Sequence, residues 1–299
     1  MIHLLDLQFL GHEDTIGAFL VKTEDGPILF ETGPHSCMER LRSELAKFDT
    51  TPEDIKHVFL PHIHLDHAGA AWAFAEHGAT IYVHPRGIKH LHDPSRLMAS
   101  AKMIYQEHMD RLWGKMQGIP MEQLRAVEQG ELLEIGGVSV KAWHTPGHAV
   151  HHIAWQLDQE LICGDVAGVQ IRGGLVVPPC PPPDIQVEDW QESIRLMRLL
   201  KVDRLWLTHF GPVDAHSDHL DLLEEQLLRY AEWMRPHFEK GADPKEVTPL
   251  FQKFTQSLLL EKGVPEKDLV QYEAANPSWM SVAGLMRYWK KRKEREAQA

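Results

Sequence analysis

The strongest constraint on this chain is a run of four potential metal ligands within six residues: His62, His64, Asp66 and His67. The run follows an apolar segment that is expected to be a buried strand. His62 and His64 are two residues apart, and in extended backbone such side chains point to the same side. Asp66 and His67 come where the chain turns into a helix expected over residues 68–76. Two pairs of side chains that point in different directions can bind two metal ions. Imidazole and carboxylate groups are suitable ligands for zinc, manganese or iron.

Three further metal-capable residues come at the ends of predicted strands downstream. His148 lies in a Thr-Pro-Gly-His turn after one predicted strand, and Asp165 and His209 each follow another. In open α/β sheets this edge is where binding sites are built. A chance cluster among 20 histidines is the alternative explanation of the first motif, and the later residues weigh against it.

The rest of the chain alternates short apolar runs with amphipathic segments, which predicts an α/β arrangement. Strands are expected over residues 16–21, 28–31, 57–60, 80–84, 138–143, 152–157, 160–163 and 204–207. Helices are expected over residues 38–48, 68–76 and 187–200. Five prolines between positions 178 and 183 exclude a helix interior and predict a stiff loop. Asn276 followed by Pro277 predicts the N-cap and the first residue of a late helix.

Two segments depart from this alternation and are predicted to be helical. Residues 86–125 are rich in Met, His and helix formers, which predicts a helical insertion. Residues 216–299 are predicted to form a C-terminal helical extension after a catalytic domain over 1–215. The extension carries two apolar stripes that need a partner surface, either the main domain or another subunit of a homodimer. The stripes are Leu220, Leu223, Leu227, Ala231 and Met234, and Val247, Leu250, Phe251, Phe254 and Leu258.

The motif and the later ligands together resemble the metallo-β-lactamase superfamily of metallohydrolases, over about residues 1–215. The ligands occur in the same order and with typical spacing. The resemblance implies a four-layer αββα sandwich with the site between the two sheet edges. It implies one metal bound by His62, His64 and His148, a second bound by Asp66, His67 and His209, and Asp165 bridging the two. The helical extension also resembles that of glutathione thioester hydrolases, which favours the glyoxalase II and lactonase-like branch.

The chain departs from the family pattern at one point near its N-terminus. Where the family has an aspartate before Thr-Gly, this chain has Glu31 before Thr32 and Gly33. The family's aspartate supports the metal ligands from behind, and the longer side chain of Glu31 could do the same. A solvent-exposed carboxylate at the strand end is the alternative.

The implied function is a metal-dependent hydrolase in which a metal-bound hydroxide cleaves a small ester, thioester or lactone. By the same resemblance, Asp66 holds the hydroxide and passes its proton to the leaving group. The chain has no Gly-x-Ser-x-Gly elbow, and this chemistry requires no serine or cysteine nucleophile. The alternative is a sulfur oxygenase with one iron ion, similar to persulfide dioxygenases, because such members keep much of the motif. A non-catalytic binding protein is disfavoured because no ligand is missing.

The net charge and the use of cysteine limit which partners and which cellular compartment we expect. The formal net charge of −12 repels phosphate backbones, which disfavours a nuclease-type member and a nucleic-acid partner. Three cysteines without a Cys-x-x-Cys pair fit a reducing compartment. No signal-peptide pattern and no stretch of about 18 apolar residues is present. We therefore expect a cytoplasmic protein without membrane contact that acts on a small molecule.

Overall fold

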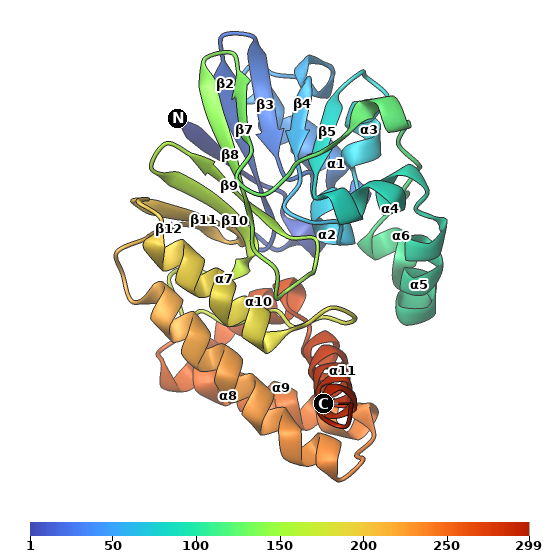
Figure 1. Ribbon diagram of the computed structural model, residues 1–299, viewed down its shortest axis with the longest axis vertical. Coiled ribbons are helices and arrows are strands. Elements are labelled where there is room, and N and C mark those ends of the chain that lie inside the picture. Colours follow the sequence, from blue (N-terminus) through green and yellow to red (C-terminus); the bar gives the residue numbers. More distant parts are fainter. Residues whose placement is uncertain (299) are drawn as a thin grey trace.

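The computed structural model describes residues 1–298, which form two six-stranded sheets stacked face to face (Figure 1). The first sheet follows chain order: β1 (Ile2–Asp6), β2 (Gly17–Thr23), β3 (Gly26–Phe30), β4 (His57–Phe59), β5 (Thr80–Val83) and β6 (Leu124–Ala126). Strands β1 to β3 pair antiparallel, and β3 to β6 pair parallel.

The second sheet has the strand order β12-β11-β10-β9-β8-β7. Its strands are β7 (Leu132–Ile135), β8 (Val138–His144), β9 (Ile153–Leu157), β10 (Glu160–Val169), β11 (Arg204–His209) and β12 (Gly211–Asp214). Neighbouring strands are antiparallel except for β10 and β11, which are parallel. The parallel pair brings the ends of β10 and β11 to the same edge of the sheet.

Aromatic side chains fill the space between the two sheets. Phe59 stacks on Phe30 at a ring distance of 4.7 Å and meets Trp155 of the facing sheet edge-on at 5.1 Å. Phe19 likewise meets Trp206 edge-on at 5.8 Å. Such contacts add to the burial of large apolar surfaces. The interface between the sheets is therefore a packed core, and the site must lie at its edge.

Helices cover the outer face of each sheet. On the first sheet these include α1 (Met38–Ala46) and α3 (Ala71–Ala75), whose buried side chains join those of the strands in one cluster. On the second sheet they include α7 (Val187–Leu199) and α8 (His219–Glu239), which form an equivalent cluster. The four layers confirm the predicted αββα sandwich.

The strands that the sequence pattern does not predict are the four edge strands, β1, β6, β7 and β12. They are short and partly exposed, so they lack the continuous apolar run of the central strands. Residues 86–125 are helical as predicted over α4 (Ile88–His92), α5 (Ser95–Tyr105) and α6 (Met109–Leu112). The prediction is wrong at the end of this segment, because Leu124 and Arg125 lie in β6, parallel to β5.

The regular elements described after residue 215 are all helical. They are α8, α9 (Pro244–Glu261), α10 (Leu269–Ala275) and α11 (Ser278–Glu296), with a 3-10 turn before α10. Helix α11 packs against both α8 and α9. The first predicted stripe is buried throughout, but Leu250 of the second is 49% exposed, which makes that prediction wrong at this position. The buried stripe on α9 is therefore narrower than the sequence predicts.

The start of α11 also differs from the prediction. Pro277 has extended backbone with ψ 126°, and the helix begins at Ser278, so the cap lies one residue later than the sequence suggests. The carboxylate of Glu273 accepts from the backbone N–H of Ser278 at 2.9 Å and serves as the cap. Asn276 instead donates to the carbonyl of Pro178 at 3.3 Å and thereby ties this turn to the proline-rich loop.

Among residues 1–298 we find no helix that combines the length and apolar character needed to span a membrane. The proline-rich segment is a loop, as predicted, and α11 packs closely against it. A side chain at Gly284 would collide with the carbonyl of Cys180, so glycine is required for this approach. The contact holds the loop and the C-terminal helices together beside the site.

Candidate metal centre

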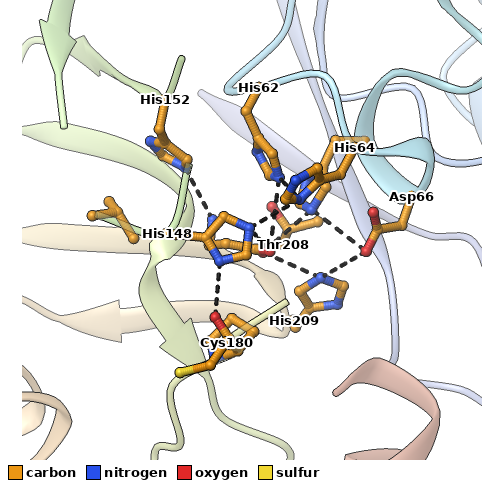
Figure 2. A network of polar contacts seen from close by, with 12 residues as sticks. His62, His64, Asp66, His148, His152, Cys180, Thr208 and His209 are labelled. Carbon is orange, nitrogen blue, oxygen red and sulfur yellow. Dashed lines mark hydrogen bonds and ion pairs between the residues drawn. The ribbon is translucent and has the colours of Figure 1, made fainter. Parts of the chain in front are cut away.

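The histidine-rich motif lies where the first sheet ends (Figure 2). His62 and His64 lie in the loop between β4 and α2 (Leu65–Ala68). Asp66 and His67 lie inside α2, so the helix begins earlier than the sequence predicts, and it is broken before α3. The backbone changes from extended at His64 to helical at Asp66, which aims the two pairs of side chains from different directions at one place.

The three later residues come from the second sheet. His148 lies in the turn between β8 and β9, as predicted. Asp165 lies inside β10 and not after it, because the strand continues through a register shift at Gly164, where φ is 53°. A side chain at Gly164 would strike Pro61 and the ring of His152, so glycine permits the bulge. His209 is the last residue of β11, slightly earlier than a position after the strand.

The first group of ligand atoms consists of three imidazoles and a carboxylate: His62, His64, His148 and Asp165. His64 Nδ1 lies 2.9 Å from His62 Nε2 and 3.0 Å from His148 Nε2. Asp165 Oδ2 lies 3.1 Å from His148 Nε2. A ring nitrogen has either one proton or one lone pair, so His64 Nδ1 cannot hydrogen-bond to both neighbours at once. A shared cation would satisfy all three nitrogens.

The second group consists of Asp66, His67 and His209. Asp66 Oδ2 lies 3.6 Å from His67 Nε2 and 3.7 Å from His209 Nε2. The other oxygen of Asp165, Oδ1, lies 3.3 Å and 3.2 Å from the same two nitrogens. Asp165 thus faces both groups with one oxygen each. The structure brings all seven residues of the sequence prediction together.

Hydrogen bonds on the far side of the rings fix which nitrogen faces the centre. His148 Nδ1 bonds to the carbonyl of Pro179 at 2.9 Å, and His209 Nδ1 bonds to the carbonyl of Thr15 at 2.6 Å. The inward atoms His67 Nε2 and Asp165 Oδ1 are buried and lack hydrogen-bond partners. Unpaired buried polar atoms are costly, and outward-anchored imidazoles are typical of metal ligands. The residues present therefore fit divalent cations in both groups.

The electrostatics of the pocket also suit cations. Burial, reinforced by neighbouring imidazoles, lowers the pKa of His62 and His64 well below the usual value, so both rings are neutral and able to bind a metal. Burial opposes protonation of His67, but the carboxylates around it outweigh that effect and raise its pKa. Burial likewise disfavours the charge on Asp165, yet the surrounding imidazoles hold its pKa well below the usual range. Negative charge gathers where the ions would lie.

Glu31 supports the site from behind, as the sequence allowed, and the alternative of a solvent-exposed carboxylate is wrong. Its side chain is 0% exposed. Its Oε2 accepts from His67 Nδ1 at 2.9 Å, and its Oε1 accepts from the hydroxyl of Thr208 at 2.5 Å. Its φ of 67° is unusual for a residue other than glycine, so the surrounding structure holds it in a strained conformation.

We expect Glu31→Ala to weaken metal binding by about 10- to 100-fold, because His67 loses the partner that orients its ring. Glu31→Gln should lose less, since an amide oxygen can still accept from His67 Nδ1. Titration of the metal-free protein with zinc against a competing chelator measures both affinities. Glu39→Ala, an exposed glutamate on α1, is the control. Equal zinc affinities for Glu31→Ala and this control would show that Glu31 does not support metal binding.

Some supporting groups leave no signal in the sequence. The carbonyls of Thr15 and Pro179 act through the backbone, and any residue type could supply them. His152 belongs to neither ligand group and supports the site from outside. Its Nε2 accepts from the backbone N–H of Asp165 at 3.3 Å, and its Nδ1 contacts the hydroxyl of Thr145 at 2.8 Å.

A cavity of about 510 Å³ opens above the two groups. Asp66, His64 and His209 are among the residues at its floor. Its walls come from α5 and α6, from the proline-rich loop and from the turn between α10 and α11. Its volume lies within the roughly 300–1,000 Å³ that small-molecule sites occupy. The cluster thus faces a space in which a small substrate fits.

Comparison with known proteins identifies a family and several relatives to which this chain is similar. The family model described as the metallo-beta-lactamase superfamily matches residues 15–209. The chain is 28% identical over 179 residues to a metallo-beta-lactamase fold-containing protein, ST1585, of Sulfurisphaera tokodaii, over 58% of this chain and 66% of that protein. It is 27% identical over 232 residues to a thioesterase, pkgB, of Emericella nidulans, over 75% of this chain and 54% of that protein. The chain thus spans about half to two thirds of the length of these curated relatives.

Solved structures show the same fold. A metallo-beta-lactamase family protein from Thermus thermophilus, TTHA1429, superposes with a TM-score of 0.66 at 19% identity, over 99% of this chain and 94% of that chain. The archaeal ST1585 structure superposes with a TM-score of 0.61 at 22% identity, over 77% of this chain and 85% of that chain. Because the family model covers most of the chain and the fold agrees, the protein belongs to the metallo-beta-lactamase superfamily.

Proposed function

We propose that this protein hydrolyses a small ester, thioester or lactone with the help of two divalent cations, most simply zinc. The observation that carries the proposal is Asp165, whose two oxygens face two separate groups of ligand atoms. One group would hold an ion through His62, His64 and His148, and the other through Asp66, His67 and His209. The relative named as a thioesterase supports an acyl substrate.

Each step of the proposed reaction can be attributed to a part of the site. Divalent cations in such a site supply a water of lowered pKa and polarise the carbonyl oxygen of the substrate. Both ligand carboxylates line the cavity, and Asp66 is the more accessible, with its side chain 22% exposed against 4% for Asp165. It can accept the proton of the attacking water and return it to the leaving group. The nearest imidazole nitrogens to this carboxylate are His67 Nε2 and His209 Nε2, at 3.6 Å and 3.7 Å from its Oδ2.

A covalent route through a cysteine is disfavoured. Cys37, Cys163 and Cys180 are all buried and none lines the cavity. Burial raises the pKa of the Cys37 thiol to about 11, and it raises those of the other two as well. A thiol is nucleophilic as the thiolate, which these positions do not favour at neutral pH. We therefore propose that water, and not a cysteine, attacks the carbonyl carbon of the substrate.

A panel of neutral esters, thioesters and lactones tests the proposal. We expect turnover of at least one class, its loss after chelation, and its return on adding zinc or manganese. His64→Ala should lower this activity by orders of magnitude, while His216→Ala, an exposed histidine outside the site, should leave it unchanged. Turnover that survives both chelation and His64→Ala would contradict the proposal, as would inactivity of the metal-loaded protein toward the whole panel.

A further inference from the structure

We propose that the substrate carries an uncharged apolar chain, which lies in a chamber built jointly by the insertion and the C-terminal helices. The reaction in which this substrate takes part rests on the function proposed above. The chamber itself rests on an independent set of residues, which form the walls of the cavity above the metal centre. The walls determine which groups the substrate can carry next to the bond that is hydrolysed.

One face of α5 forms the first wall. Leu97, Ala101 and Ile104 line the cavity from α5 at helical spacing, together with Ser100 and Tyr105. Apart from Ser100 and Tyr105, the residues of α5 that line the cavity are aliphatic. An amphipathic helix normally buries such a face against protein, whereas here Ile104 remains 41% exposed. The part of this face around Ile104 is therefore available to an apolar ligand.

The second wall comes from the turn between α10 and α11 and from the proline-rich loop. Trp279 and Met280 line the cavity from α11, and Pro181 lines it from the loop. Tyr105 of α5 meets Trp279 edge-on at a ring distance of 5.5 Å, and its hydroxyl lies 3.6 Å from the sulfur of Met280. This contact joins two segments that lie far apart in the sequence but at the same end of the sandwich (Figure 1). The two walls therefore meet at this contact.

The charges around the chamber exclude an anionic chain. No lysine or arginine occurs among the described residues that line it. The carboxylates that line it are Asp66 and Asp165 at the floor and Glu273 in the wall. Glu273 already accepts from the backbone N–H and the hydroxyl of Ser278, at 2.9 Å and 2.7 Å. A phosphate or carboxylate at the far end of the chain would lose its water without gaining a lysine or arginine partner in the walls, which is strongly unfavourable.

Chain length provides the first test. We would measure kcat/KM for the 4-nitrophenyl esters of acetate, butanoate and hexanoate, and for the adipate monoester, which matches hexanoate but ends in a carboxylate. Each added methylene should raise kcat/KM about fourfold, equivalent to about 0.8 kcal/mol, until the chamber is full. Hexanoate should therefore exceed acetate by roughly two hundredfold, and the adipate monoester should fall to the level of acetate or below. A flat series, or a preference for the adipate monoester, would overturn the proposal.

A charge placed in the wall provides the second test. Ser100→Arg adds a cation at an exposed helix position that lines the chamber, where the fold tolerates a larger side chain. Relative to the neutral variant Ser100→Gln, it should raise kcat/KM for the adipate monoester at least tenfold while leaving hexanoate within a few fold. Ser257→Arg, an exposed serine on α9 away from the cavity, should change neither substrate. Equal behaviour of Ser100→Arg and Ser257→Arg would show that Ser100 does not face the bound chain.

Binding without turnover separates this proposal from the proposed function. Butan-1-ol, hexan-1-ol and octan-1-ol are neutral and carry no bond to hydrolyse, so their affinities for the metal-loaded protein report on the chamber alone. Calorimetry should show affinity rising about fourfold per methylene with a negative heat-capacity change. Such binding without hydrolysis of any ester would support the chamber and reject the hydrolase. Ester hydrolysis without length-dependent alcohol binding would reject the chamber and leave the hydrolase standing.

Discussion

Asp165→Ala is expected to lower ester turnover by about a thousandfold or more and to reduce the metal bound by both ligand groups. Asp165 Oδ2 lies 3.1 Å from His148 Nε2, and Oδ1 lies 3.2 Å from His209 Nε2, so a single side chain serves both halves of the site. Its loss leaves the five imidazoles of the two groups, four of them buried, without the central negative charge. Stabilisation of the transition state by metals is worth several kcal/mol, and each 1.4 kcal/mol corresponds to a tenfold change in rate.

Steady-state kinetics and metal content, measured on the same preparation, check this expectation. Asp189→Ala, an exposed aspartate on α7, is the matched control and should behave like the parent protein. Thermal unfolding of both variants establishes that the fold is intact. Turnover by Asp165→Ala within tenfold of the parent, with full metal content, would show that Asp165 does not link the two groups.

Asp66→Asn is expected to lower kcat by about 10²- to 10⁴-fold, the usual contribution of a group that transfers protons in the transition state. The substitution keeps an oxygen at the same distance from the metal group but removes its ability to take up a proton. The loss should depend on the leaving group, because a poor leaving group needs the returned proton and a good one does not. Ethyl esters should therefore lose far more rate than 4-nitrophenyl esters of the same acid.

The ratio of the two losses distinguishes proton transfer from simple ligation. A residue that only holds a metal would slow both esters equally and would lower the metal content in parallel. The result that contradicts our assignment is an equal loss for ethyl and 4-nitrophenyl esters. Asp184→Asn, a part-buried aspartate outside the two groups, serves as the control.

The central strands and the site residues could be predicted from the sequence because their signals are local. The run from His62 to His67 places four ligand types in six positions, and no ordinary strand or helix explains such a cluster. The later ligands were predictable from their positions near strand ends, although the strands themselves run further than expected. The bulge at Gly164 carries β10 past Asp165, and a bulge has no periodic pattern by which to recognise it.

What the sequence did not predict depends on contacts between distant segments. The four edge strands are stabilised by their neighbours in the sheet, and their own residues carry a weak pattern. The exposure of Leu250 depends on how the C-terminal helices pack together, and the cap of α11 depends on a carboxylate from the preceding helix. The contact between Tyr105 and Trp279 arises only when the insertion and the C-terminal helices fold onto the same end of the sandwich.

The metal content of the purified, untagged full-length protein tests the central claim most directly. Elemental mass spectrometry, with protein concentration from amino-acid analysis, gives the identity and number of ions per chain. The two ligand groups predict close to two zinc or manganese ions per chain, held by a protein that hydrolyses esters. One tightly bound iron ion per chain, or no metal even after reconstitution, would contradict the dinuclear site proposed for these seven residues.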